Sequence, residues 1–149
     1  MRAVVQRVRE CSVRVDGRVT GSIDTGLLVY LGVGRNDDEK ELMKLCDKII
    51  NLRIFTDVQG KMNLSALDVR GGILVVSQFT LFGDARDGRR PSYTEAAPPD
   101  MARDFYEKAL AQLALSGLRI EHGEFQASME VAYVNLGPVT LLLDSEKRF

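Results

Sequence analysis

The sequence predicts an α+β fold, in which a mostly antiparallel β-sheet or open barrel is covered by two packed helices. Apolar runs of strand length recur along the chain and are largely joined by hairpin-length turns. Two other segments repeat apolar residues at helical spacing. No linker, internal repeat or low-complexity tract divides the 149 residues, so we expect a single domain over residues 1–149 with a substantial core.

The first third of the chain is typical of β-structure. Residues 2–8 form a β-compatible run. The segment SVRVDGRVTGSI alternates apolar and polar residues on both sides of Asp16-Gly17, which is a strong signal for a two-residue hairpin. Residues 26–33, GLLVYLGV, are continuously apolar, as in a central strand.

The hydrophobic period then changes to that of a helix. Asn36 is a candidate N-cap, and Glu39 follows three residues later, which resembles a capping box. We expect a helix over residues 37–51, with one face buried. The residues expected on that face are Leu42, Leu45, Cys46 and Ile49.

Strands dominate the remainder, with one further helix. LRIFTD and NLSAL flank a predicted turn at residues 58–61, and GGILVVSQFTLFG reads as one long strand over residues 71–83. A polar loop over residues 83–99 leads to a second helix, which we expect Asp100 to cap and Gly117 to end. Two more strands are expected near residues 118–125 and 128–143.

Composition limits the classes of partner and compartment. A formal net charge of −1 argues against a broad basic surface for coating DNA or an anionic membrane, but leaves room for a small basic groove. No apolar run approaches the roughly 20 residues that a membrane helix needs. The opening MRAVVQRVRE lacks the apolar core of a signal peptide, so we expect a cytoplasmic protein. Cys11 and Cys46 are too few for a disulfide framework and are expected to be buried thiols.

Several common catalytic arrangements are absent from the sequence. His122 is the one histidine, and a solvated position beside a turn explains it better than a catalytic triad does. One histidine and two distant cysteines do not make a metal-ligand spacing, so no metal site is expected. The chain also lacks the glycine-rich phosphate-binding motifs.

Two stretches are candidates for a functional site. In SQFTLFGD, the polar residues Ser77, Gln78 and Thr80 interrupt an apolar strand, either where the strand emerges toward solvent or as a rim of donors at a pocket. Spacing alone favours the strand end. In VNLGPVTLLL, Gly137-Pro138 breaks a strand, either as a bulge or edge, or to expose main-chain atoms. The isomer of that peptide bond does not follow from the sequence.

With both stretches considered, the chain resembles the D-aminoacyl-tRNA deacylases of the bacterial and eukaryotic type. That family carries an S-Q-F-T-L motif, here at residues 77–81, and an N-x-G-P-V-T motif, here at residues 135–140. The resemblance extends over essentially the whole chain, including the opening MRAVVQRV and RRPSY at residues 89–93.

The resemblance implies an ester hydrolase that removes D-amino acids, and glycine, from tRNA without a cofactor or metal. It implies a homodimer in which each site combines the catalytic segment of one subunit with the Gly-Pro loop of its partner. The implied catalytic residues are Ser77, Gln78, Phe79 and Thr80, and the implied substrate-binding residues are Gly137, Pro138 and Val139.

In that family the Gly-Pro peptide is cis, and its carbonyl oxygens hold the substrate amino group, so that an L side chain is rejected sterically. The resemblance also implies that the N–H groups around Phe79 and Thr80 face the ester carbonyl and that the ribose 2′-hydroxyl assists the attacking water. The rival hypothesis makes Thr80 a covalent nucleophile, for which the sequence offers no evident base.

The expected partner is the 3′ end of aminoacyl-tRNA, with no role for DNA or membrane. Arginine binds phosphate bidentately, so the candidates for RNA contact are Arg7, Arg86, Arg89 and Arg90. A solvated face is the alternative explanation of these four arginines. Two other functions stay open: a non-catalytic module that binds RNA ends, and a small-molecule amidase or esterase on the same scaffold.

Overall fold

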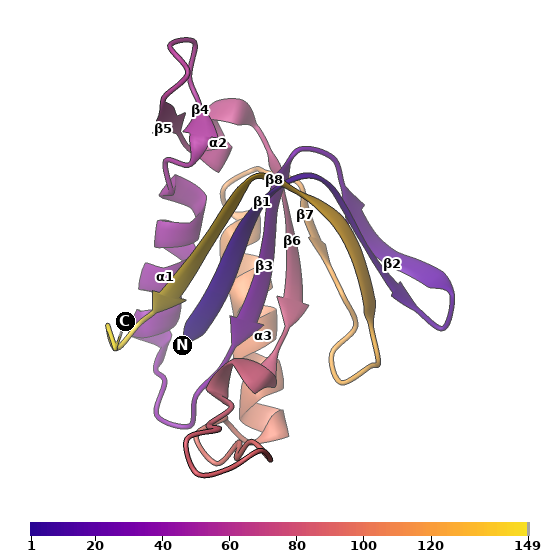
Figure 1. The fold of residues 1–149 in the computed structure, drawn as a ribbon, viewed down its shortest axis with the longest axis vertical. Helices are drawn as coiled ribbons and strands as arrows, with labels where there is room; N and C mark the ends of the chain where they lie inside the picture. The colour runs from indigo at the N-terminus through magenta and orange to yellow at the C-terminus, as the bar shows by residue number, and fades with distance from the viewer. Residues whose placement is uncertain (149) are drawn as a thin grey trace.

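The computed structural model describes residues 1–148, and its centre is a six-stranded mixed sheet with helices on one face (Figure 1). The strand order is β2-β1-β3-β6-β7, and β8 pairs with the other edge of β1. Three pairings, all made by β1, are antiparallel, and the β3–β6 and β6–β7 pairings are parallel. The strands are β1 (Arg2–Val15), β2 (Arg18–Ile23), β3 (Gly26–Gly32), β6 (Gly72–Ser77), β7 (Ile120–His122) and β8 (Glu130–Asp144). The predicted α+β class, a sheet or open barrel covered by helices, is confirmed. The sheet is mixed and not mostly antiparallel, because β3, β6 and β7 run parallel to one another.

The β1–β2 hairpin forms at the predicted turn. Asp16 and Gly17 both have positive φ angles, 48° and 77°, as a type I′ turn requires. Strand β1 is long enough to pair with β3 through its first half and with β2 through its second half. Strand β8 follows both halves of β1 along the opposite edge.

Helix α1 (Glu39–Asn51) buries the predicted apolar face, but its cap lies two residues beyond the expected position. Asp38 is the N-cap, and it shares a capping box with Glu41 instead of the predicted Asn36 and Glu39. The cause is Asp37, whose buried carboxylate accepts from the Gly34 N–H at 2.5 Å and contacts the Met1 amino group. Those contacts hold residue 37 outside the helix.

The segment between α1 and β6 contains the predicted hairpin, β4 (Phe55–Thr56) and β5 (Met62–Leu64), and a short helix that the sequence analysis missed. This helix, α2 (Ala66–Val69), is capped by Ser65 and Asp68 and ends at Arg70 in a left-handed conformation. A helix of one turn has too few residues to show a hydrophobic period, which explains why it was not predicted.

The expected single strand over residues 71–83 is wrong in its second half. Strand β6 ends at Ser77, and the 3₁₀ turn η1 (Phe79–Phe82) follows. Helix α3 (Pro99–Ala114) also begins differently, because Pro98 occupies the cap position and Asp100 lies in the first turn. Proline fits the first helical turn because the backbone N–H that it lacks would have no partner there.

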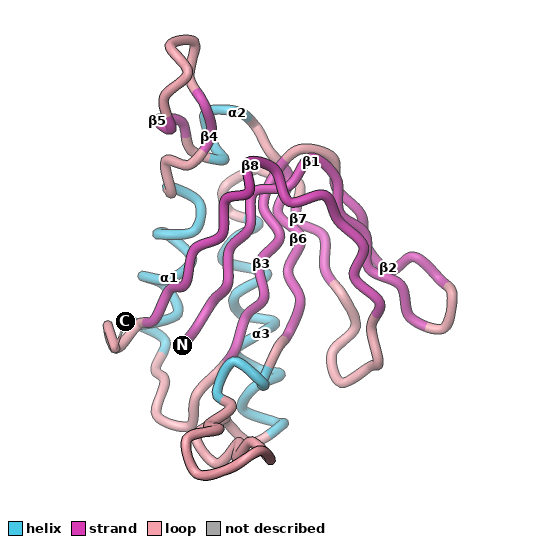
Figure 2. The backbone as a smooth tube through the Cα atoms, viewed as in Figure 1, coloured by secondary structure: helices cyan, strands magenta, loops and turns pink. Residues whose placement is uncertain are grey.

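The main core lies between the sheet and the helices α1 and α3, which both lie against the same face (Figures 1 and 2). Tyr106 of α3 is buried there and donates its hydroxyl to the Val75 carbonyl at 2.9 Å. Burial raises the pKa of the Cys11 thiol to about 11 and that of Cys46 to about 12, as expected for inert core thiols. Within residues 1–148, no helix has the length and apolar character to span a membrane.

Candidate active site

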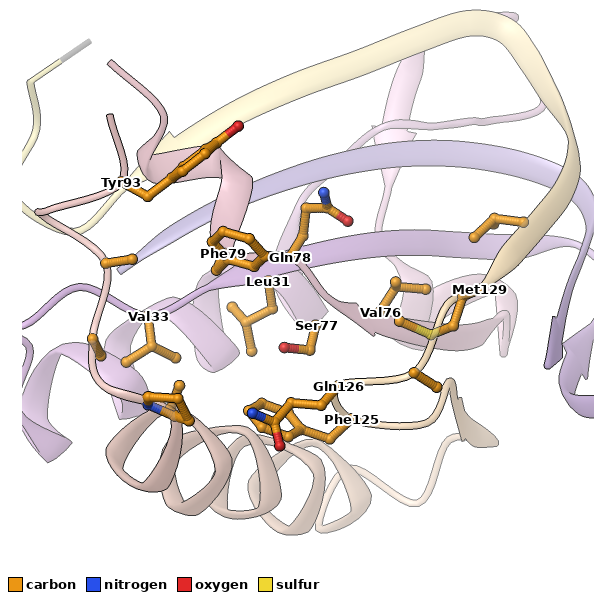
Figure 3. Close-up of a pocket in the computed structure, with 16 residues that line it drawn as sticks. Leu31, Val33, Val76, Ser77, Gln78, Phe79, Tyr93, Phe125, Gln126 and Met129 are labelled. Carbon is orange, nitrogen blue, oxygen red and sulfur yellow. The ribbon is translucent and has the colours of Figure 1, made fainter. Parts of the chain in front are cut away.

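A pocket of about 630 Å³ opens where β6 ends (Figure 3). Its sides come from the ends of β3 and β6, from the loop before α3, from the first turn of α3 and from the segment that leads into β8. The lining is mostly apolar. Its polar members are Ser77, Gln78, Tyr93 and Gln126, and the described lining contains no carboxylate or imidazole.

The end of β6 is fixed by the sheet and then turned sharply. Ser77 pairs with Leu31 of β3, and the Gln78 N–H donates to the Leu31 carbonyl at 2.8 Å. The chain then enters η1, which is closed by the bond from the Gly83 N–H to the Thr80 carbonyl at 2.9 Å. Because the N–H groups of Phe79 and Thr80 precede the first bonded residue, the turn itself provides no acceptor for them. Such main-chain donors can stabilise negative charge on an oxygen.

The side chains of this segment interact with each other and with the loop before α3. The Gln78 amide donates to the Thr80 hydroxyl. Phe79 is 56% exposed, and its ring meets Tyr93 edge to face, with centroids 5.1 Å apart. Tyr93 belongs to a loop that is pinned at its base by two backbone bonds of 2.8 Å between Asp84 and Ser92. Tyr93 directly follows this closure and lines one side of the pocket.

The Gly-Pro pair forms a bulge in β8. Gln6 of β1 pairs with Thr140 and Val8 pairs with Asn135, so residues 136–139 all lie opposite Arg7. Gly137 has a φ of 116°, and the Gly137-Pro138 peptide bond is cis. Both residues are exposed.

Two motif residues that were not predicted as site residues close the base of the bulge. Asn135 Nδ2 donates to the carbonyls of Arg7 and Val139, each at 3.0 Å, and Thr140 Oγ1 donates to Asn135 Oδ1 at 3.2 Å. The sequence could have indicated these two residues, because they stand at the two ends of the N-x-G-P-V-T motif. Their side-chain hydrogen bonds join the two ends of the bulge.

Arg7, which the sequence analysis named as a candidate for RNA contact, lies beneath the bulge and not on a solvated face. It is only 8% exposed, and its guanidinium donates to the Leu136 carbonyl at 3.2 Å and to the Ile54 carbonyl at 2.7 Å. Because the guanidinium is buried and donates to backbone carbonyls, it is not available on the surface to bind a phosphate. The alternation of buried and exposed residues along a strand could have predicted that the side chain at position 7 points inward. It gave no reason to expect a buried arginine.

The pocket and the bulge lie at opposite ends of the sheet in this chain. Ser77 pairs with Leu31 of β3, which in turn pairs with Ala3 of β1. The bulge instead lies opposite Arg7, four residues further along β1. Four residues along a strand and three strand spacings correspond to a separation of about 20 Å. Figure 2 shows the bend of β8 at the upper end and the turn after β6 at the lower end.

The sequence as a whole matches a known family. The profile of the family described as D-Tyr-tRNA(Tyr) deacylase matches residues 4–144. The chain belongs to this family. Two relatives named D-aminoacyl-tRNA deacylase, from Thermosipho africanus strain TCF52B and Desulfitobacterium hafniense strain DSM 10664 / DCB-2, are each 57% identical over 149 residues, which is all of both chains.

Solved structures share the fold. One, titled c-Myc DNA Unwinding Element Binding Protein, has a TM-score of 0.91 and 42% identity, and the match covers 97% of this chain and 98% of that chain. Another, described as a probable eukaryotic D-amino acid tRNA deacylase, has a TM-score of 0.82, 16% identity and coverage of 95% and 97%. At that lower identity the likeness concerns the fold alone.

In this member of the deacylase family, the predicted catalytic and substrate-binding residues fall into two groups. Ser77, Gln78 and Phe79 line the pocket, and Thr80 adjoins it through Gln78. Gly137, Pro138 and Val139 form the bulge. The structure brings each motif together but places the two motifs apart within the chain. His122 is exposed and contacts the Gly123 carbonyl, as expected for a residue beside a turn.

The three remaining arginines lie in the loop before α3. Arg86 is bound to Asp84, with Nη2 at 2.5 Å from Oδ2, and this pair lowers the pKa of Asp84 to about 2. Arg89 and Arg90 are exposed at the same loop. Among the described residues, no cluster of three metal-ligating side chains is found.

The sequence analysis missed the far side of the pocket. Phe125, Gln126 and Met129 line that side from the segment between β7 and β8. Tyr93, which lies against Phe79, was also not predicted as a site residue. None belongs to the two quoted motifs. Of these residues, only Tyr93 could have been noticed in the sequence, because it lies in the RRPSY stretch that also resembles the family.

Proposed function

We propose that this chain hydrolyses the ester bond between a D-amino acid and the 3′-terminal ribose of tRNA, releasing the free amino acid and tRNA in the cytoplasm. Family membership supports the reaction class. The observation that carries the assignment to a site is the position of the Ser77–Thr80 segment, which forms the edge of a pocket of about 630 Å³. That volume lies within the range of about 300–1,000 Å³ that is typical of small-ligand sites.

Two copies of the chain complete the proposed site. The bulge is separated from its own pocket by about 20 Å in the sheet geometry, so one chain alone does not place both against one aminoacyl ester. A second copy can supply the missing half, and two-fold symmetry would then form two equal sites.

The face of the sheet that turns away from the helices is buried only in part, by a second core cluster that includes Leu28 and Leu74, and its exposed apolar residues support that assembly. Val4 of β1 pairs with Tyr30 on one side and with Leu142 on the other, and Leu142 is 60% exposed. Tyr133 and Leu136 of β8 are also exposed, at 39% and 40%. Burying such a row of apolar side chains favours self-association, because each Å² of apolar surface removed from water contributes about 25 cal/mol.

Selection by handedness follows if the partner's bulge binds the substrate amino group. The Gly137 and Pro138 carbonyls are the candidates to accept hydrogen bonds from an ammonium group, because those of Leu136 and Val139 already accept from Arg7 and Asn135. The amino group and the ester carbonyl are then both fixed, so the side chain of a D-residue points to the open mouth of the site. An L side chain would instead collide with Gly137-Pro138. Glycine has no side chain to collide, so glycyl-tRNA is expected to be a substrate.

Hydrolysis in this scheme needs orientation more than acid–base groups. Water attacks the ester carbonyl carbon, the carbonyl oxygen becomes an oxyanion, and the Phe79 and Thr80 N–H groups stabilise it. The ribose 3′-oxygen then leaves with a proton and the acid is released. The neighbouring 2′-hydroxyl orients the water, which agrees with a described lining that offers no carboxylate or imidazole.

The exposed arginines of the loop before α3 are the proposed contacts for phosphates near the acceptor end. Arg89 and Arg90 are exposed in this loop. Arg86 is also exposed, but its guanidinium already forms a salt bridge with Asp84. Arg7 is left out of this role because its guanidinium is buried. A few contacts of this kind predict a shallow dependence of affinity on salt.

A deacylation assay tests the proposal and separates it from its alternatives. The purified chain is incubated with D-Tyr-tRNA, L-Tyr-tRNA and Gly-tRNA, and release of the amino acid is followed. We expect turnover of the first and third and survival of the second. Binding of tRNA without turnover would indicate an RNA-end binding module, and equal activity on free D-amino acid esters would indicate a general esterase.

A further inference from the structure

The turn η1 holds the Phe79 and Thr80 N–H groups at the edge of the pocket, but it has weak internal support. It contains two main-chain hydrogen bonds, one from the Gly83 N–H to the Thr80 carbonyl at 2.9 Å and one from the Leu81 N–H to the Gln78 carbonyl at 3.4 Å. The second is longer than the usual range of about 2.7–3.2 Å. Contacts with the rest of the fold must therefore set the direction of the N–H groups.

Phe82, the last residue of η1, packs on the backbone at the end of β3. A Cβ on Gly34 would lie 2.9 Å from Phe82 Cε1 and Cζ, and a Cβ on Gly32 would lie 3.2 Å from Phe82 Cε2. Both glycines are buried. The absence of side chains at these two positions lets the far edge of the ring approach the strand this closely.

Arg2 of β1 contacts η1 at two points. Its guanidinium lies over the Phe82 ring, with Cζ 4.5 Å from the centroid, and its Nη1 donates to the Leu81 carbonyl at 2.9 Å. Its Nε donates to Asp144 Oδ2 at 3.1 Å, and the Asp144 side chain is only 2% exposed. An arginine can make all three contacts at once because its guanidinium is planar and its donors point in fixed directions.

We propose that Arg2 is a positioning residue for ester hydrolysis. It holds the Leu81 carbonyl and the Phe82 ring, and the turn then keeps its first N–H groups, those of Phe79 and Thr80, directed at the carbonyl oxygen of the ester. The inference rests on the proposed function, which uses these N–H groups to stabilise the oxyanion. Arg2 itself lies outside the described pocket lining, so it acts through the turn.

This role predicts an effect on the chemical step and not on substrate binding. Main-chain donors stabilise an oxyanion only when they point at the position where it forms. A displacement of about 1 Å can lower the rate about 100-fold. Binding depends mainly on the pocket lining, to which Arg2 does not belong.

Single-turnover kinetics with D-Tyr-tRNA and excess enzyme separate the two effects. In Arg2→Met, the maximal rate should fall about 10- to 100-fold, while the half-saturating enzyme concentration changes less than about threefold. A non-hydrolysable amide analogue, 3′-(D-tyrosylamino)-3′-deoxyadenosine, should bind this variant and the wild type with the same Kd. Arg2→Lys keeps a charge beside Asp144 but lacks the planar fork, so its rate should lie between those of the wild type and Arg2→Met.

Three further variants control for stability and charge. Phe82→Leu removes the ring that Arg2 holds and should also lower the maximal rate without changing the Kd of the analogue, and it serves as the test if Arg2→Met does not fold. Asp38→Ala weakens the fold at the α1 cap, away from η1, and should keep the wild-type rate. Arg14→Met removes an exposed arginine from the same strand as Arg2 and should match the wild type.

The inference is overturned if Arg2→Met hydrolyses D-Tyr-tRNA at the wild-type maximal rate, or if its loss of activity follows weaker binding of the analogue. It is also overturned if folded Arg2→Lys and Phe82→Leu both match the wild type. Turnover by the wild-type chain separates this failure from failure of the proposed function. If the wild type is active and the variants equal it, the deacylase proposal stands and the role of Arg2 falls.

Discussion

Arg7 and Gly137 show at the residue scale how a buried charge supports an exposed loop. A Cβ on Gly137 would lie 2.7 Å from Arg7 Nη2, so the guanidinium and the bulge are packed without space for another atom. Arg7 also bridges the bulge to the Ile54 carbonyl at the base of the β4–β5 hairpin. The sequence motif identified the loop but could not identify its support, because Arg7 is more than a hundred residues away along the chain.

Gly137→Ala is expected to destabilise the fold more than Gly60→Ala and to abolish deacylation. Both glycines have positive φ, 116° and 80°, so both variants carry a backbone cost of about 1–2 kcal/mol. Only Gly137 faces a close neighbour, since nothing lies within 4 Å of a Cβ on Gly60. Urea unfolding measures the difference, and equal loss of stability with retained activity would contradict the packing described for Arg7.

Thr80→Ala tests whether the Thr80 hydroxyl acts as a covalent nucleophile. The Thr80 hydroxyl accepts from the Gln78 amide, and the described pocket lining contains no base to deprotonate it. We expect kcat to fall by less than about tenfold, as for loss of one hydrogen bond. Single-turnover kinetics with D-Tyr-tRNA measure this. A substrate with a 2′-deoxy terminal adenosine should lose much more, whereas a loss of several orders of magnitude in the variant would restore the nucleophile hypothesis.

At the scale of elements, the sequence predicted the helices and strands well and their ends less well. The apolar face of α1 was predicted correctly because its period is long, but its first residue depends on the tertiary contacts of Asp37 with Met1 and Gly34. The end of β6 was missed for a related reason. The apolar residues of FTLF continue the pattern of a strand, although the chain there has turned into η1.

Asp38→Ala and Asn36→Ala form a matched pair that tests the position of the α1 cap. The Asp38 carboxylate accepts from the Glu41 N–H at 2.8 Å, and its loss should cost about 1 kcal/mol of unfolding free energy. Asn36 is exposed outside the helix, so Asn36→Ala should change stability by less than about 0.5 kcal/mol. The opposite ranking in thermal or urea unfolding would place the cap where the sequence pattern had it.

The loop before α3 should respond to acid through Asp84. The hydrogen bonds from Arg86 lower the pKa of Asp84 from 3.8 to about 2 in the folded chain. Because the folded pKa lies below the unfolded value, this pair stabilises the loop above about pH 4 and its contribution is lost as the pH falls toward 2. NMR titration of the Asp84 carboxyl carbon measures the value. Arg86→Gln should return it toward 3.8, and an unshifted wild-type value would exclude the pair.

At the scale of the whole molecule, composition and pattern predicted the α+β class and a sheet or open barrel covered by helices, but not the strand order or the parallel pairings. The parallel β3–β6 and β6–β7 pairings place strands side by side that are separated by helices in the chain. Hairpin signals act only between neighbouring strands, so they cannot specify such pairings. The far side of the pocket was missed for the same reason, because Phe125 and Gln126 reach it through tertiary structure.

The separation of the two motifs has a consequence for the assembly as a whole. If the Ser77–Thr80 segment and the Gly137-Pro138 bulge act on one substrate, they must come from different copies of the chain. Stereoselectivity would then depend on dimer formation, and a monomeric variant would lose recognition of the amino group together with its activity.

Complementation between two inactive variants tests this shared site most directly. Ala102→Trp fills the pocket and leaves the bulge intact, whereas Gly137→Ala alters the bulge and leaves the pocket intact. Each variant alone should be inactive. When equal amounts are unfolded and refolded together, half of the dimers are mixed and each carries one intact site, so about a quarter of wild-type activity on D-Tyr-tRNA should return with L-Tyr-tRNA still spared. A mixture as inactive as its components would show that both motifs act within one chain and would contradict the account.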